Sequence, residues 1–161
     1  MSEVFRQGAP AELWQALVRE SAARSGCALD EPREAYLVMV LLRYQREAGL
    51  LAHTFALDWL HAHAQVGRTR RDALRDVGDR CLLVAGLFPG LARRRRVSVD
   101  YFVDLGRGAY REVAEAGRSA YDALFGQLAQ DYRQLVAVLS GLRGQGANLA
   151  WQPVPQGATR H

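Results

Sequence analysis

The strongest constraint on the fold is a helical apolar pattern that stops abruptly at a proline and a glycine. Apolar side chains recur at steps of three or four residues, on one face of a helix: Leu74, Val77, Cys81, Ala85 and Phe88. Pro89 and Gly90 follow at once and prevent that helix from continuing. After a run of arginines, Ser98 has the residue type of an N-cap, and Asp100 lies in the next turn. The stretch from Gly78 to Gly117 therefore predicts two helices joined by a sharp break.

The second of these helices is expected to bury a stripe of small and apolar side chains: Phe102, Leu105, Ala109, Val113 and Ala116. Gly106 lies beside this stripe, and its lack of a side chain allows another backbone to approach closely. The opposite side of the helix is charged, and its residues are spaced so that Asp104 can pair with Arg107, and Arg111 with Glu115. We interpret this charged side as a solvated surface rather than a catalytic one.

Similar signals divide the rest of the chain into helices. The first is expected to open at Pro10, after a loose segment through Ala9, and to end before Gly26. The run Tyr36–Leu42 is apolar on all sides and predicts a central helix; a buried strand is the alternative, disfavoured because the flanking residues extend the pattern helically. The remaining expected helices cover roughly residues 50–65, 69–88, 98–117 and 119–143. The second of these is expected to open at Thr69, which with Asp72 three residues on resembles a capping box.

The expected fold is therefore all-α, an irregular bundle of about six helices in a single domain. The helical domain is expected to cover residues 1–143. Residues 144–161 contain glycine and proline without a periodic pattern, and we expect them to form an extended or flexible C-terminal tail.

The composition limits the class of protein. A chain of 161 residues that is 49% hydrophobic and 24% charged matches an ordinary globular protein. The apolar run Tyr36–Leu42 is far shorter than the roughly 20 residues of a membrane-spanning helix, and the N-terminus has no signal-peptide pattern, so we expect no membrane span and a cytoplasmic location. Cys27 and Cys81 lie in unrelated contexts and are expected to be reduced thiols.

One segment of the chain also resembles a known group of proteins. The pattern runs from Gly78-Asp79 through Gly86-Leu87-Phe88-Pro89 and the arginines to Val99-Asp100-Tyr101-Phe102, Leu105-Gly106 and Ala109-Tyr110. It is similar to a family of uncharacterised bacterial all-helical proteins of unknown function. The resemblance covers about a quarter of the chain and consists of core and turn residues, so it implies a related fold and no activity.

The positive charge is concentrated in one part of the chain. The formal net charge is +4, and all 21 basic residues are arginine, as a GC-rich coding sequence would impose. Residues 66–97 contain nine arginines and three aspartates, a local charge of +6. Arg68, Arg70 and Arg71 are expected at a helix N-terminus, where the helix dipole disfavours positive side chains, so they predict an anion site or an acidic-partner site.

A second cluster, Arg93, Arg94, Arg95 and Arg96, follows a helix C-terminus, where cations are favourable, and it is the weaker candidate. A helix of about 20 residues is roughly 30 Å long, so the two clusters are expected at opposite ends of it. Neither cluster is interleaved with aromatic residues, and nucleic-acid binding is therefore unlikely.

The remaining candidate residues are histidines, tyrosines and one aspartate. His53 and His61 are eight helical residues apart, or about 12 Å, too far to share one ion, and we expect neither a metal nor any other cofactor. Asp58, His61, Tyr101 and Tyr110 form an alternative pocket in which the tyrosine rings would be partly buried.

These observations favour a non-catalytic interaction or self-associating module, with a protein partner or a second copy of the chain. The alternative is a helical bundle that binds a small molecule, possibly as an enzyme, and the third candidate is a nucleic-acid-binding protein.

Overall fold

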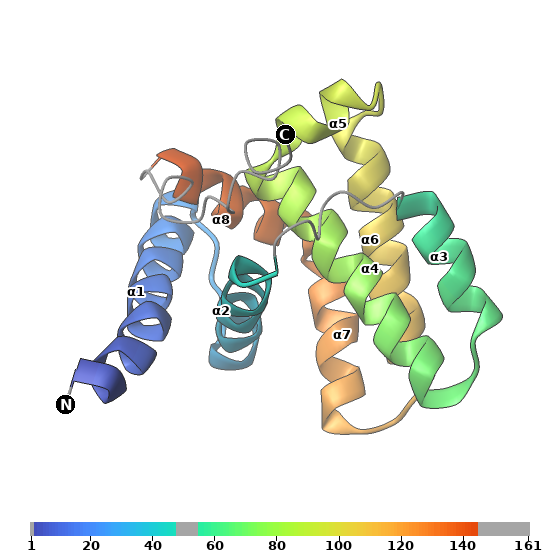
Figure 1. Ribbon diagram of the computed structural model, residues 1–161, viewed down its shortest axis with the longest axis horizontal. Coiled ribbons are helices and arrows are strands. Elements are labelled where there is room, and N and C mark those ends of the chain that lie inside the picture. Colours follow the sequence, from blue (N-terminus) through green and yellow to red (C-terminus); the bar gives the residue numbers. More distant parts are fainter. Residues whose placement is uncertain (1, 48–54, 145–161) are drawn as a thin grey trace, which may run out of the picture. The chain divides into compact units, whose positions relative to one another are not determined.

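The computed structural model describes residues 2–47 and 55–144. Every secondary-structure element in these residues is a helix, which confirms the predicted all-α class. The elements are α1 (Ser2–Ser25), α2 (Glu31–Gln45), α3 (Phe55–Ala64), α4 (Gly67–Leu87), α5 (Pro89–Arg94), α6 (Val99–Glu115), α7 (Ala120–Gln130) and α8 (Tyr132–Gly144) (Figure 1). Contacts divide the chain into two compact units: residues 1–50 with 137–161, and residues 51–136.

The described residues form eight helices rather than about six, because two expected boundaries are different. Phe88 ends α4 and immediately precedes α5, so Pro89 opens a new short helix, where its fixed φ suits the first turn. The expected last helix is interrupted at Asp131, whose φ of −99° and ψ of 18° depart from helical values. It is thus two helices, α7 and α8.

Two predicted helix starts are wrong. The helix α1 begins at Ser2, with Pro10 inside it, so the segment before Pro10 is helical rather than loose. A helix satisfies its backbone hydrogen bonds locally and does not require an apolar period. The helix α4 begins at Gly67 after the N-cap Val66, not at a capping box of Thr69 and Asp72. The glycine adopts a φ of +59°, which residues with a side chain rarely adopt, and so the chain turns earlier than expected.

Two other helix starts carry side-chain caps, and the cap of α6 is one that the sequence predicted. The Ser98 hydroxyl accepts a hydrogen bond from the Tyr101 backbone N–H at 3.1 Å, and opens α6. The Asp30 carboxylate accepts one from the Arg33 backbone N–H at 3.1 Å, and opens α2. Such caps satisfy backbone donors that the first helical turn leaves without partners.

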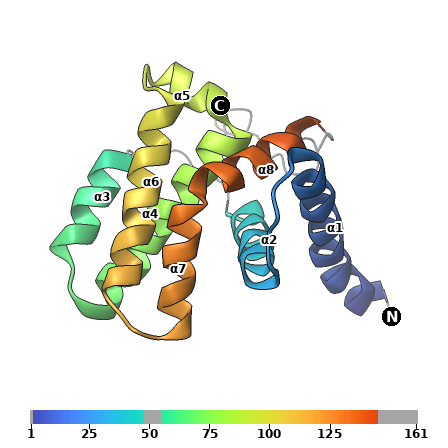
Figure 2. The same cartoon turned by 180° about the vertical axis from the view of Figure 1, so that it is seen from behind.

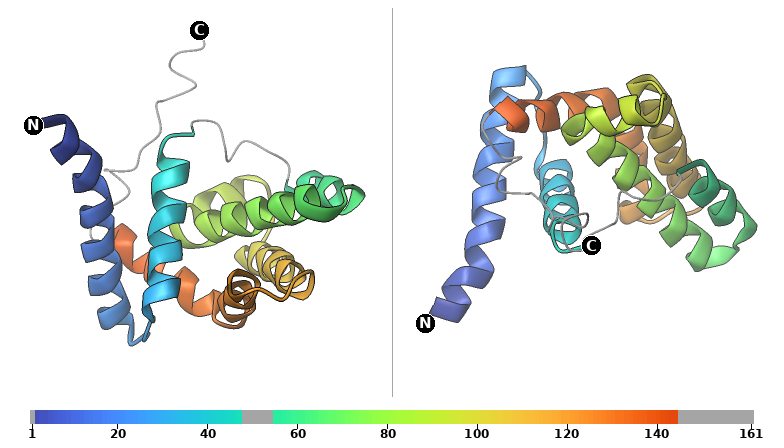
Figure 3. Two further views of the ribbon diagram at one scale, coloured as in Figure 1. Left: turned by 90° about the horizontal axis from the view of Figure 1, so that it is seen from below. Right: turned by 45° about the horizontal axis from the view of Figure 1, so that its top comes forward.

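In the first unit, α1 and α2 lie side by side (Figure 3). The buried Trp14 indole of α1 donates a hydrogen bond to the Gln45 side chain of α2 at 3.1 Å. The Ser21 hydroxyl donates to the Val138 carbonyl of α8 at 2.6 Å. The apolar run Tyr36–Leu42 lies in α2, so the helical interpretation is confirmed over the strand, although Met39 remains 40% exposed.

In the second unit, α4 packs against α3 and α6, and α6 packs against α7 (Figure 2). The predicted apolar face of α4 is buried at Leu74, Val77, Cys81 and Ala85. On α6, Gly106 and Ala109 are buried against neighbouring helices of the same chain; the nearest atoms to Gly106 come from Tyr132 and Cys81. The close approach predicted for this stripe is therefore internal, and the stripe offers no support for self-association.

Candidate anion-binding cleft

A cleft of about 470 Å³ lies in the second unit, between the first turns of α4 and the helices α6 and α7. Its lining contains three arginines, one aspartate, one valine and one tyrosine: Arg68, Arg71, Asp72, Arg75, Val113 and Tyr121. The volume lies within the range of about 300–1,000 Å³ that is typical of small-ligand sites.

The helical period of α4 brings the three arginines into one row. Arg71 follows Arg68 by three residues, and Arg75 follows Arg71 by four, so their side chains leave the same side of the helix. At 1.5 Å per residue the row extends for about 10 Å. Guanidinium groups bind carboxylates and phosphates with paired N–H donors, and three of them in one cleft therefore form a place suited to an anion.

The ion pair between Arg71 and Asp122 fixes the middle of this row. The Nη2 atom of Arg71 donates to Oδ1 of Asp122, whose side chain is only 5% exposed. The other carboxylate oxygen accepts hydrogen bonds from the Ser119 backbone N–H at 3.0 Å and from its hydroxyl at 2.8 Å, within the capping box of α7. These contacts anchor the Arg71 guanidinium to the start of α7.

The Arg75 side chain connects the cleft to an aromatic ring. Its Nη1 atom donates a long hydrogen bond of 3.4 Å to the Tyr121 hydroxyl. The Tyr121 ring packs edge-on against Phe125, with 5.0 Å between ring centroids, yet the residue is 46% exposed. A partly exposed aromatic surface therefore lies next to the arginines.

The predicted cluster of Arg68, Arg70 and Arg71 is only partly brought together. Arg68 and Arg71 line the cleft, whereas Arg70 pairs with Glu112 of α6 at 2.9 Å. The same carboxylate oxygen of Glu112 lies 2.7 Å from Nε2 of His63 on α3. Arg70 thus belongs to a contact that joins α3, α4 and α6.

Arg75 was missed as a candidate because it is separated from the other arginines in the sequence. The signal that could have found it is its helical spacing of seven residues from Arg68 and four from Arg71. Arg70 was predicted instead because it is adjacent to Arg71 in the sequence, but its side chain leaves α4 in a different direction.

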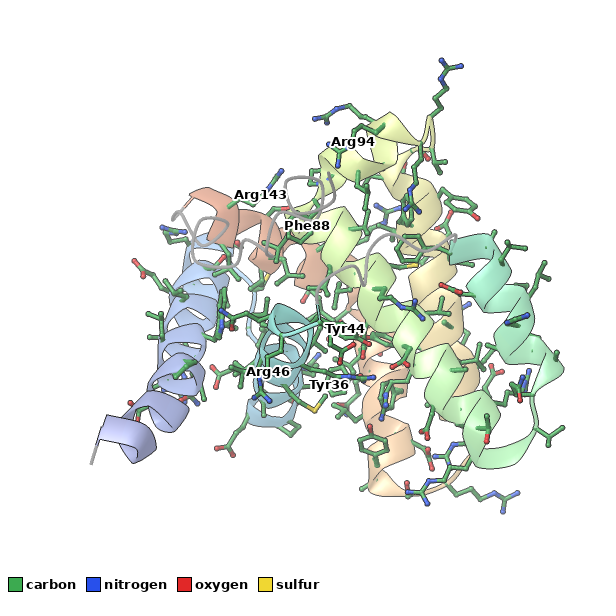
Figure 4. All side chains as sticks on the ribbon, in the orientation of Figure 1. Tyr36, Tyr44, Arg46, Phe88, Arg94 and Arg143 are labelled. Carbon is green, nitrogen blue, oxygen red and sulfur yellow. The ribbon has the colours of Figure 1, made fainter. Side chains whose placement is uncertain are left out.

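The second arginine cluster lies at the other end of α4, as the length of that helix predicted. Arg93 and Arg94 are exposed on the short helix α5, beyond the C-terminal end of α4 (Figure 4). The Arg95 guanidinium lies over the Phe55 ring, 5.4 Å from its centroid, a cation–π distance. Arg96 follows with a φ of +57°. None of these four residues lines the cleft.

The four residues of the alternative pocket are dispersed over different surroundings. Asp58 pairs with Arg80 at 3.0 Å, and His61 is exposed on α3. Tyr101 is 40% exposed, whereas Tyr110, nine residues later on α6, is fully buried. None of the four lines the arginine cleft.

Residues 2–47 and 55–144 contain neither a cluster of metal-ligating side chains nor a membrane-spanning helix. No three His, Cys, Asp or Glu side chains in these ranges gather closely enough to hold a metal ion. No helix in the same ranges is both long and apolar enough to cross a membrane. Gly144, the first residue of the expected tail 144–161, ends α8, and the rest of that tail lies outside the described residues, as does His53.

The Asp122 contacts predict a dependence of stability on pH. The Ser119 hydrogen bonds, and then Arg71, hold the pKa of the Asp122 carboxyl below its usual value near 3.8. The ionised carboxylate therefore stabilises the fold above about pH 4, and this contribution is lost as the pH falls through the lowered pKa. We expect Asp122→Asn to lower the free energy of unfolding at pH 7. Below pH 4, the free energy of unfolding should decrease less with falling pH in the variant than in the unmodified protein. Urea titrations followed by circular dichroism measure both effects.

Asp104→Asn is the matched control for this prediction, because Asp104 pairs with Arg107 at 3.2 Å but its side chain is 64% exposed. Exposed pairs contribute little to stability. An equal loss of stability at pH 7 in both variants would contradict the role assigned to the Asp122 contacts.

The chain matches no protein-family model, and neither the curated proteins nor the solved structures contain a significant match. The resemblance of residues 78–110 to a bacterial helical family stays a hypothesis.

Proposed function

We propose that the protein is a non-catalytic binding module that recognises an anionic group of its partner in the cleft of α4, α6 and α7. The observation that carries the proposal is the convergence of Arg68, Arg71 and Arg75 on one cleft. In the proposal the partner is another protein or a second copy of the chain, encountered in the bacterial cytoplasm.

The chemistry of the lining favours binding over catalysis. Guanidinium groups remain charged at all physiological pH values and do not exchange protons in general acid–base catalysis. The Cys81 thiol lies in the interior of the second unit, where burial raises its pKa strongly. A thiol in such surroundings is unreactive.

The test measures binding of a fluorescein-labelled hexaglutamate peptide by fluorescence anisotropy at 50 mM salt. We expect the double variant Arg68→Gln/Arg75→Gln to bind at least tenfold more weakly, since each lost charge-assisted hydrogen bond costs about 1.5 kcal/mol or more. Arg71 is kept because it also pairs with Asp122.

The control is Arg93→Gln/Arg94→Gln, which removes the same net charge from exposed positions on α5. We expect less than a twofold change in peptide affinity for this variant. Equal weakening by the two double variants would mean that overall charge attracts the peptide, and the assignment to the cleft would fail.

A further inference from the structure

The arginine row and the aromatic wall of the cleft together indicate which class of anion it accepts. We infer that the ligand is a phosphate monoester attached to a planar ring, of the size of a nucleoside monophosphate. This inference rests on the proposed anion-binding function: the nucleotide occupies the same cleft and competes there with the anionic group of the protein partner.

The number of donors favours phosphate over a single carboxylate. Each guanidinium carries five N–H donors, and Asp122 accepts a hydrogen bond from only one nitrogen of Arg71, Nη2. The Nε atom of Arg71 is buried without a hydrogen-bond partner among the described residues. A phosphate monoester offers three terminal oxygens and a charge of about −1.5 to −2 at pH 7, so it can contact several guanidinium groups at once, whereas a carboxylate has two oxygens.

The charges around the cleft are consistent with one such group. The lining carries three positive charges, on Arg68, Arg71 and Arg75, and one negative charge, on Asp72. Outside the lining, Arg71 pairs with Asp122, and the Arg75 guanidinium lies 3.7 Å from the Asp76 carboxylate. Asp122 is held behind Arg71 by Ser119. The lining itself therefore has a net positive charge before a ligand binds.

Tyr121 and Val113 favour a ligand with a ring. The Tyr121 ring is held from one side by Phe125, and its hydroxyl accepts the hydrogen bond from Arg75, so its orientation is constrained. Nearly half of the residue remains exposed, and Val113 adds an apolar wall. A planar ring can stack on the tyrosine while its phosphate contacts the arginines.

The size of the cleft also favours a compact ligand. Its volume of about 470 Å³ accommodates a phosphate and a ring system.

The experiment is isothermal titration calorimetry on the full chain, with adenosine 5′-monophosphate, inorganic phosphate, adenosine and hexaglutamate as separate titrants. We expect the monophosphate to bind at least tenfold more tightly than inorganic phosphate or adenosine, and to displace labelled hexaglutamate. Tyr121→Leu should weaken monophosphate binding about tenfold and leave phosphate binding unchanged, while Tyr121→Phe, which keeps the ring, should retain affinity within threefold.

Tyr101→Leu is the matched control, because Tyr101 is similarly exposed at 40% but lies outside the cleft. Equal affinities for monophosphate and inorganic phosphate, with no effect of Tyr121→Leu, would overturn ring recognition and leave the anion site intact. Binding of hexaglutamate through Arg68 and Arg75 without any binding of the monophosphate would overturn the inference but not the proposed function. Binding of no anion would overturn both.

Discussion

Gly106→Ala is expected to lower the free energy of unfolding by about 3 kcal/mol. A methyl group at this position on α6 would lie 2.6 Å from Cζ of Tyr132 and 2.8 Å from Cβ of Cys81, closer than side-chain carbons approach. Tyr132 cannot move aside easily, because it is fully buried and its hydroxyl donates to the Gly78 carbonyl at 2.8 Å. Urea denaturation followed by circular dichroism at 222 nm measures the effect.

Gly108→Ala, two residues further along the same helix, is the control. Apart from the adjacent residues and the backbone of α6 itself, no atom of the described residues lies within 4 Å of a methyl group placed there. Alanine is favoured over glycine in a helix interior by about 0.8–1.0 kcal/mol. Alanine should therefore destabilise the folded protein at Gly106 and stabilise it slightly at Gly108. A similar change at both positions would show that the close packing around Gly106 does not determine the stability of the unit.

The helices could be predicted because their signals are local. The apolar period through Leu74, Val77 and Cys81 identified the buried face of α4, and Ser98 identified the start of α6. Each of these signals lies within a few residues of the structure that it specifies. At Gly106 the sequence predicted the close approach of another backbone, but the atoms that lie there are side-chain atoms of Tyr132 and Cys81, which only the tertiary structure determines.

The boundaries that were predicted wrongly are places where two local signals compete. Thr69 and Asp72 have the spacing of a capping box, yet Gly67 turns the chain earlier through its positive φ. Around Asp131, the apolar pattern continues on both sides of the break that separates α7 from α8. A periodic pattern in sequence therefore does not guarantee a continuous helix.

The cleft could be predicted only in part, since its composition depends on residues far apart in sequence. The position of Arg68 and Arg71 near the start of a helix was apparent, but their separation from Arg70 depends on Glu112, 42 residues beyond Arg70. The anchoring of Arg71 depends on Asp122, 51 residues away. Such long-range pairs are specified by the packing of α4 against α6 and α7, for which one sequence contains no direct signal.

Tyr110→Phe is expected to lower the free energy of unfolding by about 2 kcal/mol, because it removes a hydrogen bond to a buried carboxylate. The Tyr110 hydroxyl donates to Oδ1 of Asp79, and both residues are fully buried in the second unit. Phenylalanine keeps the edge-on ring contacts with Phe125 and Tyr132, at centroid distances of 5.3 and 5.5 Å. The decrease in the free energy of unfolding, measured by urea denaturation, is therefore due to loss of the hydroxyl group and not to a change in the packing of the ring.

Two comparisons separate this hydrogen bond from other effects. Tyr101→Phe removes a hydroxyl from the same helix at a residue that is 40% exposed, and it should change the free energy of unfolding by less than about 0.5 kcal/mol. In the background of Asp79→Asn, which removes the charge of the acceptor, the cost of Tyr110→Phe should fall because a hydrogen bond to a neutral group contributes less. An unchanged cost in that background would mean that the hydroxyl stabilises the fold through something other than the Asp79 carboxylate.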